Sequence, residues 1–197
     1  MPAETTQTAP KSPSASPTRA RILAAANELF YANGIRATSA DRIIDEVGIT
    51  KVTFYRHFRT KSDLVVAYLE GQAAAEREWM RSVRRPGDPV GSLLAFAESI
   101  GTVSCTPGFR GCAFINAAAE FPDADDPVRH TVDAHRRWML AEFAEIAAEA
   151  GASPVPSVAK QLMLLRDGAM VNGYLGEPAD VAESLGGAFA SVIAPAR

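Results

Sequence analysis

The segment Thr38–Lys61, TSADRIIDEVGITKVTFYRHFRTK, predicts two short helices joined by a tight turn. Thr38 and Asp41 have the spacing of a capping box, so we expect Thr38 to cap the first helix. The apolar face of this helix consists of Ile43, Ile44 and Val47. Gly48 follows, and it can end the helix because glycine adopts positive φ without strain.

The second helix of this segment has one apolar and one polar side. Thr50 can cap it, and apolar residues three and four apart predict a buried side made of Val52, Phe54, Tyr55 and Phe58. Its outer side carries Lys51, Thr53, Arg56 and His57, together with the phenol of Tyr55. Such groups hydrogen-bond to base edges and phosphates, as a helix in the major groove must. A helical hairpin with a solvated basic face remains the alternative for this segment alone.

Motifs on both sides of the segment make Arg19–Leu69 resemble the DNA-binding domain of the tetracycline-repressor (TetR/AcrR) family. The family pattern is an aromatic residue before Gly, a Thr/Ser-capped helix, Gly-aliphatic-Thr/Ser, and Tyr-x-His-Phe followed by Lys. Here these motifs are Phe30 to Gly34, Thr38 and Ser39, Gly48-Ile49-Thr50, Tyr55-Arg56-His57-Phe58, and Lys61. The spacing from Phe30 to Gly34 is one residue longer than in the family. The resemblance covers about a quarter of the chain.

The resemblance implies a homodimeric transcriptional regulator, a repressor that binds a palindromic DNA operator and responds to a small-molecule effector. Lys51, Thr53 and Tyr55 would read the operator, while the other contact residues would hold phosphates. The expected DNA-binding residues are Thr38, Ser39, Thr50, Lys51, Thr53, Tyr55, His57 and Lys61. The alternative from another class is a small α-helical ligand carrier or enzyme whose basic N-terminal part is incidental.

Composition and charge agree with a protein that touches DNA at one end. The chain has 197 residues, 47% of them hydrophobic, which is enough for a substantial core. Its net charge is −3, but residues 1–62 hold nine Lys/Arg against five Asp/Glu, and residues 63–197 hold eleven against eighteen. A basic head on an acidic body suits one-sided DNA contact. With no apolar run of membrane-span length and no signal-peptide pattern, we expect a cytoplasmic protein without membrane contact.

The chain divides into three predicted parts: a disordered tail at 1–17, a helix-turn-helix DNA-binding domain at 18–62, and an effector-binding and dimerisation domain at 63–197. Pro, Ser and Thr dominate the tail. Thr18 is expected to cap a first helix from Arg19 to Asn33. A solvated leader is the favoured interpretation of Lys11, Arg19 and Arg21, and an arm that reaches a minor groove is the alternative.

The rest of the chain predicts an all-α fold without strand alternation. We expect a helix capped by Thr60 that runs from Asp63 to about Arg84 and bridges head and body. Further helices are expected at Val90–Val103, Pro127–Glu149, Val158–Leu175 with Ser157 as cap, and Ala179–Ile193 after Pro178.

The body also holds a candidate effector pocket. Gly111-Cys112-Ala113-Phe114-Ile115-Asn116-Ala117 resembles the LmrA/YxaF-like branch of the same family, whose body carries Gly-Cys-x-aromatic-x-Asn-Ala. The family resemblance implies a pocket within the helical body. A mostly apolar set with a few polar groups suits it: Phe96, Phe114, Asn116, Trp138, Met163, Asp167 and Tyr174. For each of them, an ordinary core position is the alternative.

The last two predicted helices are rich in Gly and Ala. Glycine inside a helix costs about 1 kcal/mol relative to Ala, so close helix packing is the expected reason. In the family, these two helices pack against their copies in a four-helix dimer interface. Candidate interface residues are Leu162, Leu165, Met170, Leu185 and Phe189, with packing inside one chain as the alternative.

Other reactive side chains give weaker signals. Cys105 and Cys112 suggest two buried structural thiols, with a redox switch as the alternative. His130 and His135, with Asp133 between them, are spaced so that a helix would splay the histidines apart, so we expect no metal site. No phosphate loop or nucleophile motif occurs in the sequence. We therefore expect no cofactor, no catalytic residue and no enzymatic activity.

Overall fold

The computed structural model describes residues 16–194, which form helices joined by turns, with no strand among them. The predicted all-α class is confirmed, and residues 1–15 of the predicted tail lie outside the described part. In chain order, the helices are α1 (Pro17–Asn33), α2 (Ala40–Val47), α3 (Lys51–His57), α4 (Lys61–Val83), α5 (Pro89–Ser104), α6 (Ala113–Glu120), α7 (Pro127–Glu149), α8 (Val155–Leu175), a 3₁₀ turn η1 (Pro178–Asp180) and α9 (Val181–Ile193).

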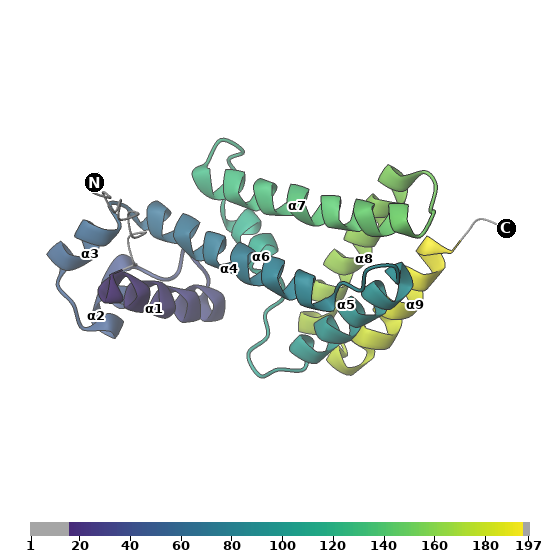
Figure 1. Cartoon of the computed structure of the whole chain (residues 1–197). Coiled ribbons are helices and arrows are strands. Elements are labelled where there is room, and N and C mark those ends of the chain that lie inside the picture. The colour runs from purple at the N-terminus through teal and green to yellow at the C-terminus, as the bar shows by residue number, and fades with distance from the viewer. Residues whose placement is uncertain (1–15, 195–197) are drawn as a thin grey trace, which may run out of the picture.

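Helices α1 to α3 form one end of the molecule, which we call the head (residues 17–60; Figure 1). The long helix α1 buries Ile22, Ala26 and Phe30 and packs against α2, which in turn contacts α3. Such short helices are not stable alone, so this shared core holds them in place. Gly48 has φ 68°, in the left-handed region, and ends α2 as expected.

Two predicted helix starts in the head are wrong. Helix α1 begins at Pro17 with Ser16 as its N-cap, so Thr18 does not mark its start. Helix α2 is capped by Ser39, whose Oγ accepts a hydrogen bond from the Arg42 N–H at 3.1 Å. Thr38 is instead fully buried and donates to the carbonyl oxygen of Gly34 at 2.8 Å. Its hydroxyl fastens the turn after α1, so the predicted Thr38–Asp41 capping box does not form.

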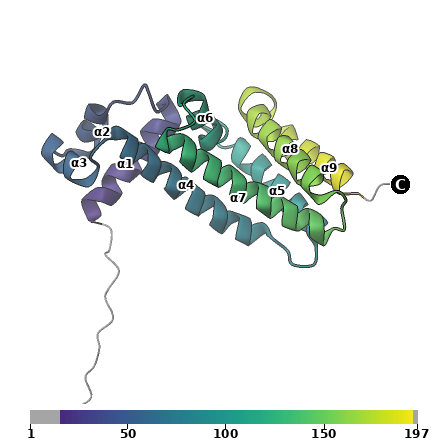
Figure 2. The same cartoon turned by 90° about the horizontal axis from the view of Figure 1, so that it is seen from above.

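Helix α4 connects the head to the remaining helices, which we call the body (residues 84–194). Its predicted cap is confirmed: Thr60 and Asp63 form a reciprocal capping box, with both hydrogen bonds at 3.0 Å. The first half of α4 buries Leu64 and Leu69, and its second half buries Met80. Figure 2 shows α4 and α7 running side by side along the molecule. Because α4 belongs to both cores, it couples the two parts mechanically.

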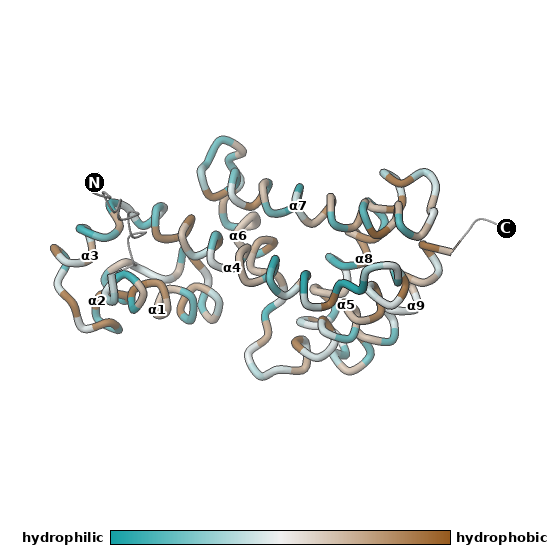
Figure 3. The backbone as a smooth tube through the Cα atoms, viewed as in Figure 1, coloured by the Kyte–Doolittle hydropathy of each residue, from teal (hydrophilic) through white to brown (hydrophobic). Residues whose placement is uncertain are grey.

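The body core lies between α5, α7, α8 and α9. Phe96, Phe143 and Phe189 meet there with ring centroids 5.5 to 6.1 Å apart. Helix α7 has the predicted bounds, whereas α8 begins at Val155, three residues before the predicted start, with Pro154 in place of Ser157 as cap. Hydrophobic and hydrophilic residues alternate along the helices in Figure 3, as amphipathic helices require. Within the described residues, none of the helices combines the length and apolar character of a membrane span.

Candidate functional site

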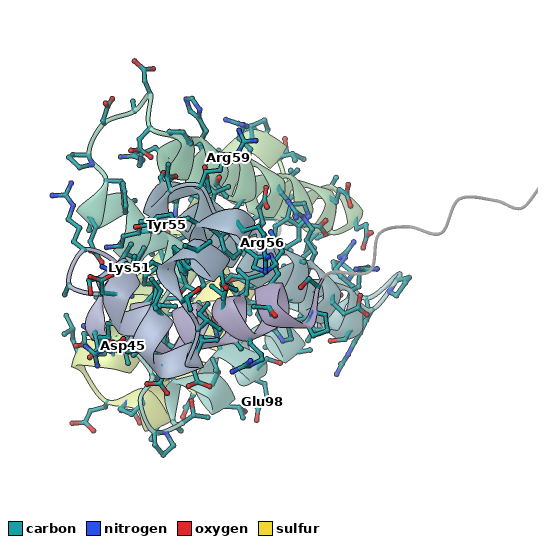
Figure 4. All side chains as sticks on the ribbon, turned by 90° about the vertical axis from the view of Figure 1, so that its left-hand side faces the viewer. Asp45, Lys51, Tyr55, Arg56, Arg59 and Glu98 are labelled. Atoms are coloured by element: carbon teal, nitrogen blue, oxygen red, sulfur yellow. The ribbon has the colours of Figure 1, made fainter. Side chains whose placement is uncertain are left out.

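Helix α3 lies at the outer end of the head, and its cap fixes which side chains face outward. The Thr50 Oγ1 accepts a hydrogen bond from the Thr53 N–H at 3.2 Å and lies 3.0 Å from the Thr53 hydroxyl. Figure 4 looks onto this end: Lys51, Tyr55 and Arg56 come from α3 there, and Arg59 follows in the next turn. The same outer end therefore carries cations, hydroxyls and a phenol.

The predicted apolar side of α3 is only partly correct. Phe54 and Phe58 are buried, but the Val52 side chain is 79% exposed and Tyr55 is 46% exposed. A helix of seven residues buries one narrow stripe, and here residues four apart occupy it. Val52, predicted to be buried, is therefore an outward apolar group beside Lys51. Tyr55 leans with its ring edge against Phe54, at a centroid distance of 5.2 Å, which leaves its outer part in solvent.

Lys51 forms an exposed ion pair across the turn between α2 and α3. Its Nζ lies 2.9 Å from a carboxylate oxygen of Asp41 on α2. Hydrogen bonding to that carboxylate raises the pKa of Lys51, so the amine is charged at neutral pH. Exposed pairs of this kind contribute little to stability. The lysine can therefore exchange Asp41 for a phosphate or base edge at small cost.

Other predicted contact residues surround α3 with different degrees of access. Ser39 and Thr50 are exposed at the starts of their helices. Lys61 is half-buried, its Nζ donates to the Arg36 carbonyl at 3.5 Å, and burial lowers its pKa. The Nε2 of His57 is buried and has no hydrogen-bond partner among residues 16–194, so it reaches a phosphate only after rotation. Thr38 is too deeply buried to contact DNA.

Four arginines near α3 were absent from the predicted contact set or were assigned elsewhere. Arg56 and Arg59 are exposed, and their position beside Tyr55 and Phe58 was the available sequence signal. Arg21 donates to the Val47 carbonyl, and the Arg19 guanidinium lies 4.9 Å from the Phe58 ring centroid. The last two thus pack on the head, and Lys11 of the predicted arm lies outside the described residues.

Hydrogen bonds fasten the head to the body at two places, and at the first of them the Arg110 guanidinium also donates to the Ala32 carbonyl. The Tyr31 hydroxyl of α1 donates to the Gly111 carbonyl at 3.0 Å and accepts from the Arg110 N–H at 2.8 Å. Burial raises the pKa of Tyr31, so this phenol stays protonated. The Glu120 carboxylate of α6 accepts from the N–H groups of Ile35 and Arg36, at 2.9 and 2.6 Å. The turn between α1 and α2 is therefore attached directly to α6.

A pocket of about 630 Å³ opens beside these ties, where α1 meets α4, α5, α8 and the loop before α6. We call it the joint pocket. None of the seven predicted effector residues is among the described residues that line it. Its lining includes Asn27 and Tyr31 of α1, Trp79 of α4, Ile100 of α5 and Arg166 of α8. The predicted effector residues lie in the body but outside the joint pocket.

The seven predicted residues are dispersed through the body. Phe96 is in the aromatic core, and Phe114 stacks on His135 with centroids 3.6 Å apart. Asn116, Met163 and Asp167 line three different smaller pockets. Trp138 bonds to Glu142 within α7, and Tyr174 is exposed. Phe114 and Asp167 do line one smaller pocket together. The sequence pattern found residues of the right type, but helix contacts that are remote in sequence decide which of them meet.

A buried charged group lies at one wall of the joint pocket. Arg166 is 3% exposed, and its guanidinium contacts Asp167 at 3.1 Å and Glu76 at 3.5 Å. Glu76 also lies 3.0 Å from the Nε2 of His135. Burial acts to lower the pKa of Arg166, but Cys112 and Glu76 outweigh it and raise the pKa. The guanidinium is therefore a permanent positive charge in the protein interior.

The predicted interface residues lie mostly inside the chain. Leu162, Met170, Leu185 and Phe189 are buried, and Leu165 is half-buried. The outward face of α8 instead carries Leu164, Val171 and Leu175, of which Leu164 is 71% and Leu175 74% exposed. An added Cβ at Gly173 would lie 2.4 Å from the Ser104 Oγ, whereas one at Gly168 or Gly187 would meet nothing within 4 Å in the described chain. Packing inside the chain thus explains Gly173 but not Gly168 or Gly187.

The two cysteines and the histidines are separated in the fold. Cys112 is buried, but Cys105 is exposed, so the prediction of two buried thiols is wrong for Cys105. Helix α5 ends at Ser104, which leaves Cys105 in the loop that follows. His135 points into the core, while His130 is exposed one and a half turns earlier on α7.

Comparisons with known proteins agree with this arrangement. Residues 22–68 match the family described as bacterial regulatory proteins, tetR family, and residues 89–154 match the tetracyclin repressor-like C-terminal domain. The crystal structure of SCO4454, a TetR-family transcriptional regulator from Streptomyces coelicolor, is 40% identical in sequence. That match covers 89% of this chain and 94% of SCO4454, with a TM-score of 0.85.

Two curated relatives match over shorter segments. The transcriptional repressor NemR of Escherichia coli K12 is 25% identical over 63% of this chain and 64% of NemR. The transcriptional regulator LmrA of Bacillus subtilis 168 is 29% identical over 61% of this chain and 66% of LmrA. The chain thus spans just under two thirds of the length of each curated relative. Taken together, the two family matches and the likeness to SCO4454 show that the chain belongs to the TetR family of DNA-binding transcriptional regulators.

Proposed function

We propose that this chain acts as a homodimeric repressor that binds a palindromic operator and releases it in response to a small molecule. The observation that carries the proposal is the outer end of the head, where Lys51, Tyr55 and Arg56 project from one short helix held by a buried phenylalanine core. These groups match the donors that read base edges and phosphates in a major groove.

The proposed contacts follow from which side chains are accessible. Lys51, Thr53 and Tyr55 face bases, while Ser39, Thr50 and Arg56 face phosphates at the margins of the groove. Lys61 joins the phosphate contacts when its Nζ leaves the Arg36 carbonyl, and His57 joins them by rotating. Thr38 is not part of this set, because its side chain is buried under the turn.

The dimer is proposed to form through the outward faces of α8 and α9, which lie beside each other in Figure 2. Leu164, Val171 and Leu175 follow one another on α8 at helical spacing and leave apolar area in solvent. Gly168 and Gly187 leave room for a second backbone to approach closely. A twofold axis here would present two copies of α3 to successive major grooves, which is how dimers read palindromes.

The experiment that tests this proposal is selection of bound fragments from sheared genomic DNA at near-physiological salt. Recovery of a palindromic sequence would support a dimeric regulator. The control is the variant Lys51→Ala/Arg56→Ala, which keeps both buried phenylalanines of the head and should recover no such sequence. Binding of the wild-type protein without sequence preference, also after ligand stripping by denaturation and refolding, would contradict the proposal.

A further inference from the structure

Helix α3 carries one apolar side chain that the core of the head does not take up. Val52 is 79% exposed, the largest exposed fraction among the large hydrophobic residues of the part that the structure describes. Valine is β-branched, so at an exposed helix position it stabilises the helix less than a straight-chain polar residue does. Neither burial in the head nor helix formation therefore accounts for a valine at this position.

Val52 lies among the side chains that are proposed to contact DNA. At 3.6 residues per turn, its position falls between those of Tyr55 and Arg56 around the helix axis. Residues three and four apart are neighbours on a helix surface, so the valine adjoins both of them. Figure 4 shows Tyr55 and Arg56 at the outer end of the head. The valine is therefore part of the surface that α3 offers to a partner.

Cations lie on both sides of Val52. Lys51 is on the side toward α2, where its Nζ pairs with Asp41, and Arg56 lies to the right of Lys51 in Figure 4. A cation can bind a phosphate or a base acceptor, whereas a valine side chain can bind neither. With the two cations beside it, Val52 would face the floor of a major groove, where the edges of the bases are accessible.

Thymine is the base that presents a methyl group in the major groove, while the other base edges present hydrogen-bond donors and acceptors. An apolar side chain placed against a donor or acceptor displaces water and offers no partner, which is unfavourable. Placed against the methyl group, it buries apolar area on both molecules, which is favourable. An exposed valine on a helix that reads DNA therefore favours thymine.

From this placement we propose that Val52 determines specificity by packing against the C5 methyl group of one thymine in each half-site of the operator. Lys51, Thr53 and Tyr55 remain the hydrogen-bonding readers, and Val52 adds an apolar contact that selects a base by its methyl group. The inference rests on the proposed function, because it requires that α3 enters the major groove of an operator. It deepens that function by naming a chemical group of the DNA that one further residue recognises.

The test removes the methyl group from the DNA. In the operator recovered by genomic selection, each thymine of a half-site is replaced in turn by deoxyuridine, together with its symmetry mate in the other half-site. Deoxyuridine lacks only the methyl group, so base pairing and the hydrogen-bonding groups of the edge are retained. For the wild-type protein, we expect one position at which affinity falls about tenfold, because a buried methyl group is lost from each of two contacts.

The decisive variant is Val52→Ser, which removes both methyl groups of an exposed side chain and should leave the head folded. For this variant, we expect the thymine and deoxyuridine operators to bind with affinities within about twofold of each other, because the two partners of one contact are coupled. Val90→Ser is the matched control. Val90 is also an exposed valine at the second position of its helix, α5, but it lies in the body. This control should keep the tenfold loss on deoxyuridine.

A second variant covers the case in which Val52→Ser fails to fold. Val52→Ala introduces the best helix former and shortens the side chain, so the loss on deoxyuridine should shrink to less than about fourfold.

The possible failures can be told apart. Equal affinity of the wild-type protein for the thymine operator and for every deoxyuridine operator would overturn the methyl contact and leave the proposed function intact. A full loss on deoxyuridine that persists in Val52→Ser and Val52→Ala would overturn the assignment to Val52. If genomic selection recovers no palindromic operator, the proposed function fails, and this inference fails with it.

Discussion

The head and the body are both built from amphipathic helices, yet their candidate sites are assembled in different ways. In the head, Lys51, Tyr55 and Arg56 lie within six consecutive residues, and one cap at Thr50 orients them all. In the body, the joint pocket is assembled from α1, α4, α5, α8 and a loop. Local sequence can therefore specify the first site but not the second.

Features that depend on local sequence were predicted well. Helix α7 was predicted at Pro127–Glu149 and found there, because Asp126 caps it and Pro127 occupies its first turn, both of which are local signals. The predicted cap at Thr60 rests on an equally local signal. In the head, the motif at Gly48 to Phe58 placed the outward residues except Val52, for which a spacing of three was misleading.

The errors have equally specific causes. Thr38 and Ser39 are both good caps, but the Thr38 hydroxyl donates to the carbonyls of Gly34 and Leu29 and is buried, which leaves Ser39 to cap α2. The predicted pocket residues do not line the joint pocket, because contacts between helices remote in sequence decide which side chains meet there. Buried and interface positions are equally hydrophobic, so the sequence alone does not distinguish the predicted interface residues from Leu164 and Leu175, which solvent exposure in the fold does.

The largest effect is expected from removing the ring that supports α3. Phe54→Ala leaves a cavity in the small head core, and such changes cost about 3 to 5 kcal/mol. DNA binding should be lost, while the body keeps its helices and its self-association. Thermal unfolding followed by circular dichroism, together with sedimentation analysis, measures both parts. Loss of self-association in the same variant would show that head and body do not behave as separate units.

Removing outward cations should impair the head without unfolding it. For Lys51→Ala/Arg56→Ala, we expect operator affinity to fall about a hundredfold, since each good contact is worth roughly 1 to 3 kcal/mol. The slope of log affinity against log salt should fall by about two. Arg85→Ala, an exposed arginine of the body, is the control and should change neither quantity. Fluorescence anisotropy on a labelled operator measures both.

Within the body, two glycines should respond in opposite ways to the same substitution. Gly173→Ala forces a Cβ into the Ser104 hydroxyl and should destabilise the fold by about 1 to 3 kcal/mol. Gly187→Ala meets nothing in the described chain and should stabilise α9 by up to about 1 kcal/mol. It should nevertheless weaken self-association if the backbone of a second copy lies there. Chemical denaturation and dilution experiments separate the two effects, and a destabilised Gly187→Ala fold would contradict the assignment.

The smallest effect is expected at the tie between the two parts. Glu120→Ala removes the acceptor of two head N–H groups and should cost about 1 kcal/mol or slightly more. Amide hydrogen exchange at Ile35 and Arg36 should become faster, and exchange in α7 should not. Glu142→Ala serves as the control, because in the described chain the Glu142 carboxylate bonds only to Trp138, within α7. Unchanged exchange at Ile35 and Arg36 would mean that the tie does not hold the turn.

The most direct test of the central claim is the stoichiometry and symmetry of the protein on a selected operator. Native mass spectrometry should give two chains per duplex, or a multiple of two. Footprinting should protect two half-sites whose centres lie about one helical turn, or a multiple of it, apart. An operator with one half-site scrambled should bind at least about tenfold more weakly. One chain per duplex, or equal affinity for the scrambled operator, would contradict a dimeric regulator that reads DNA through α3.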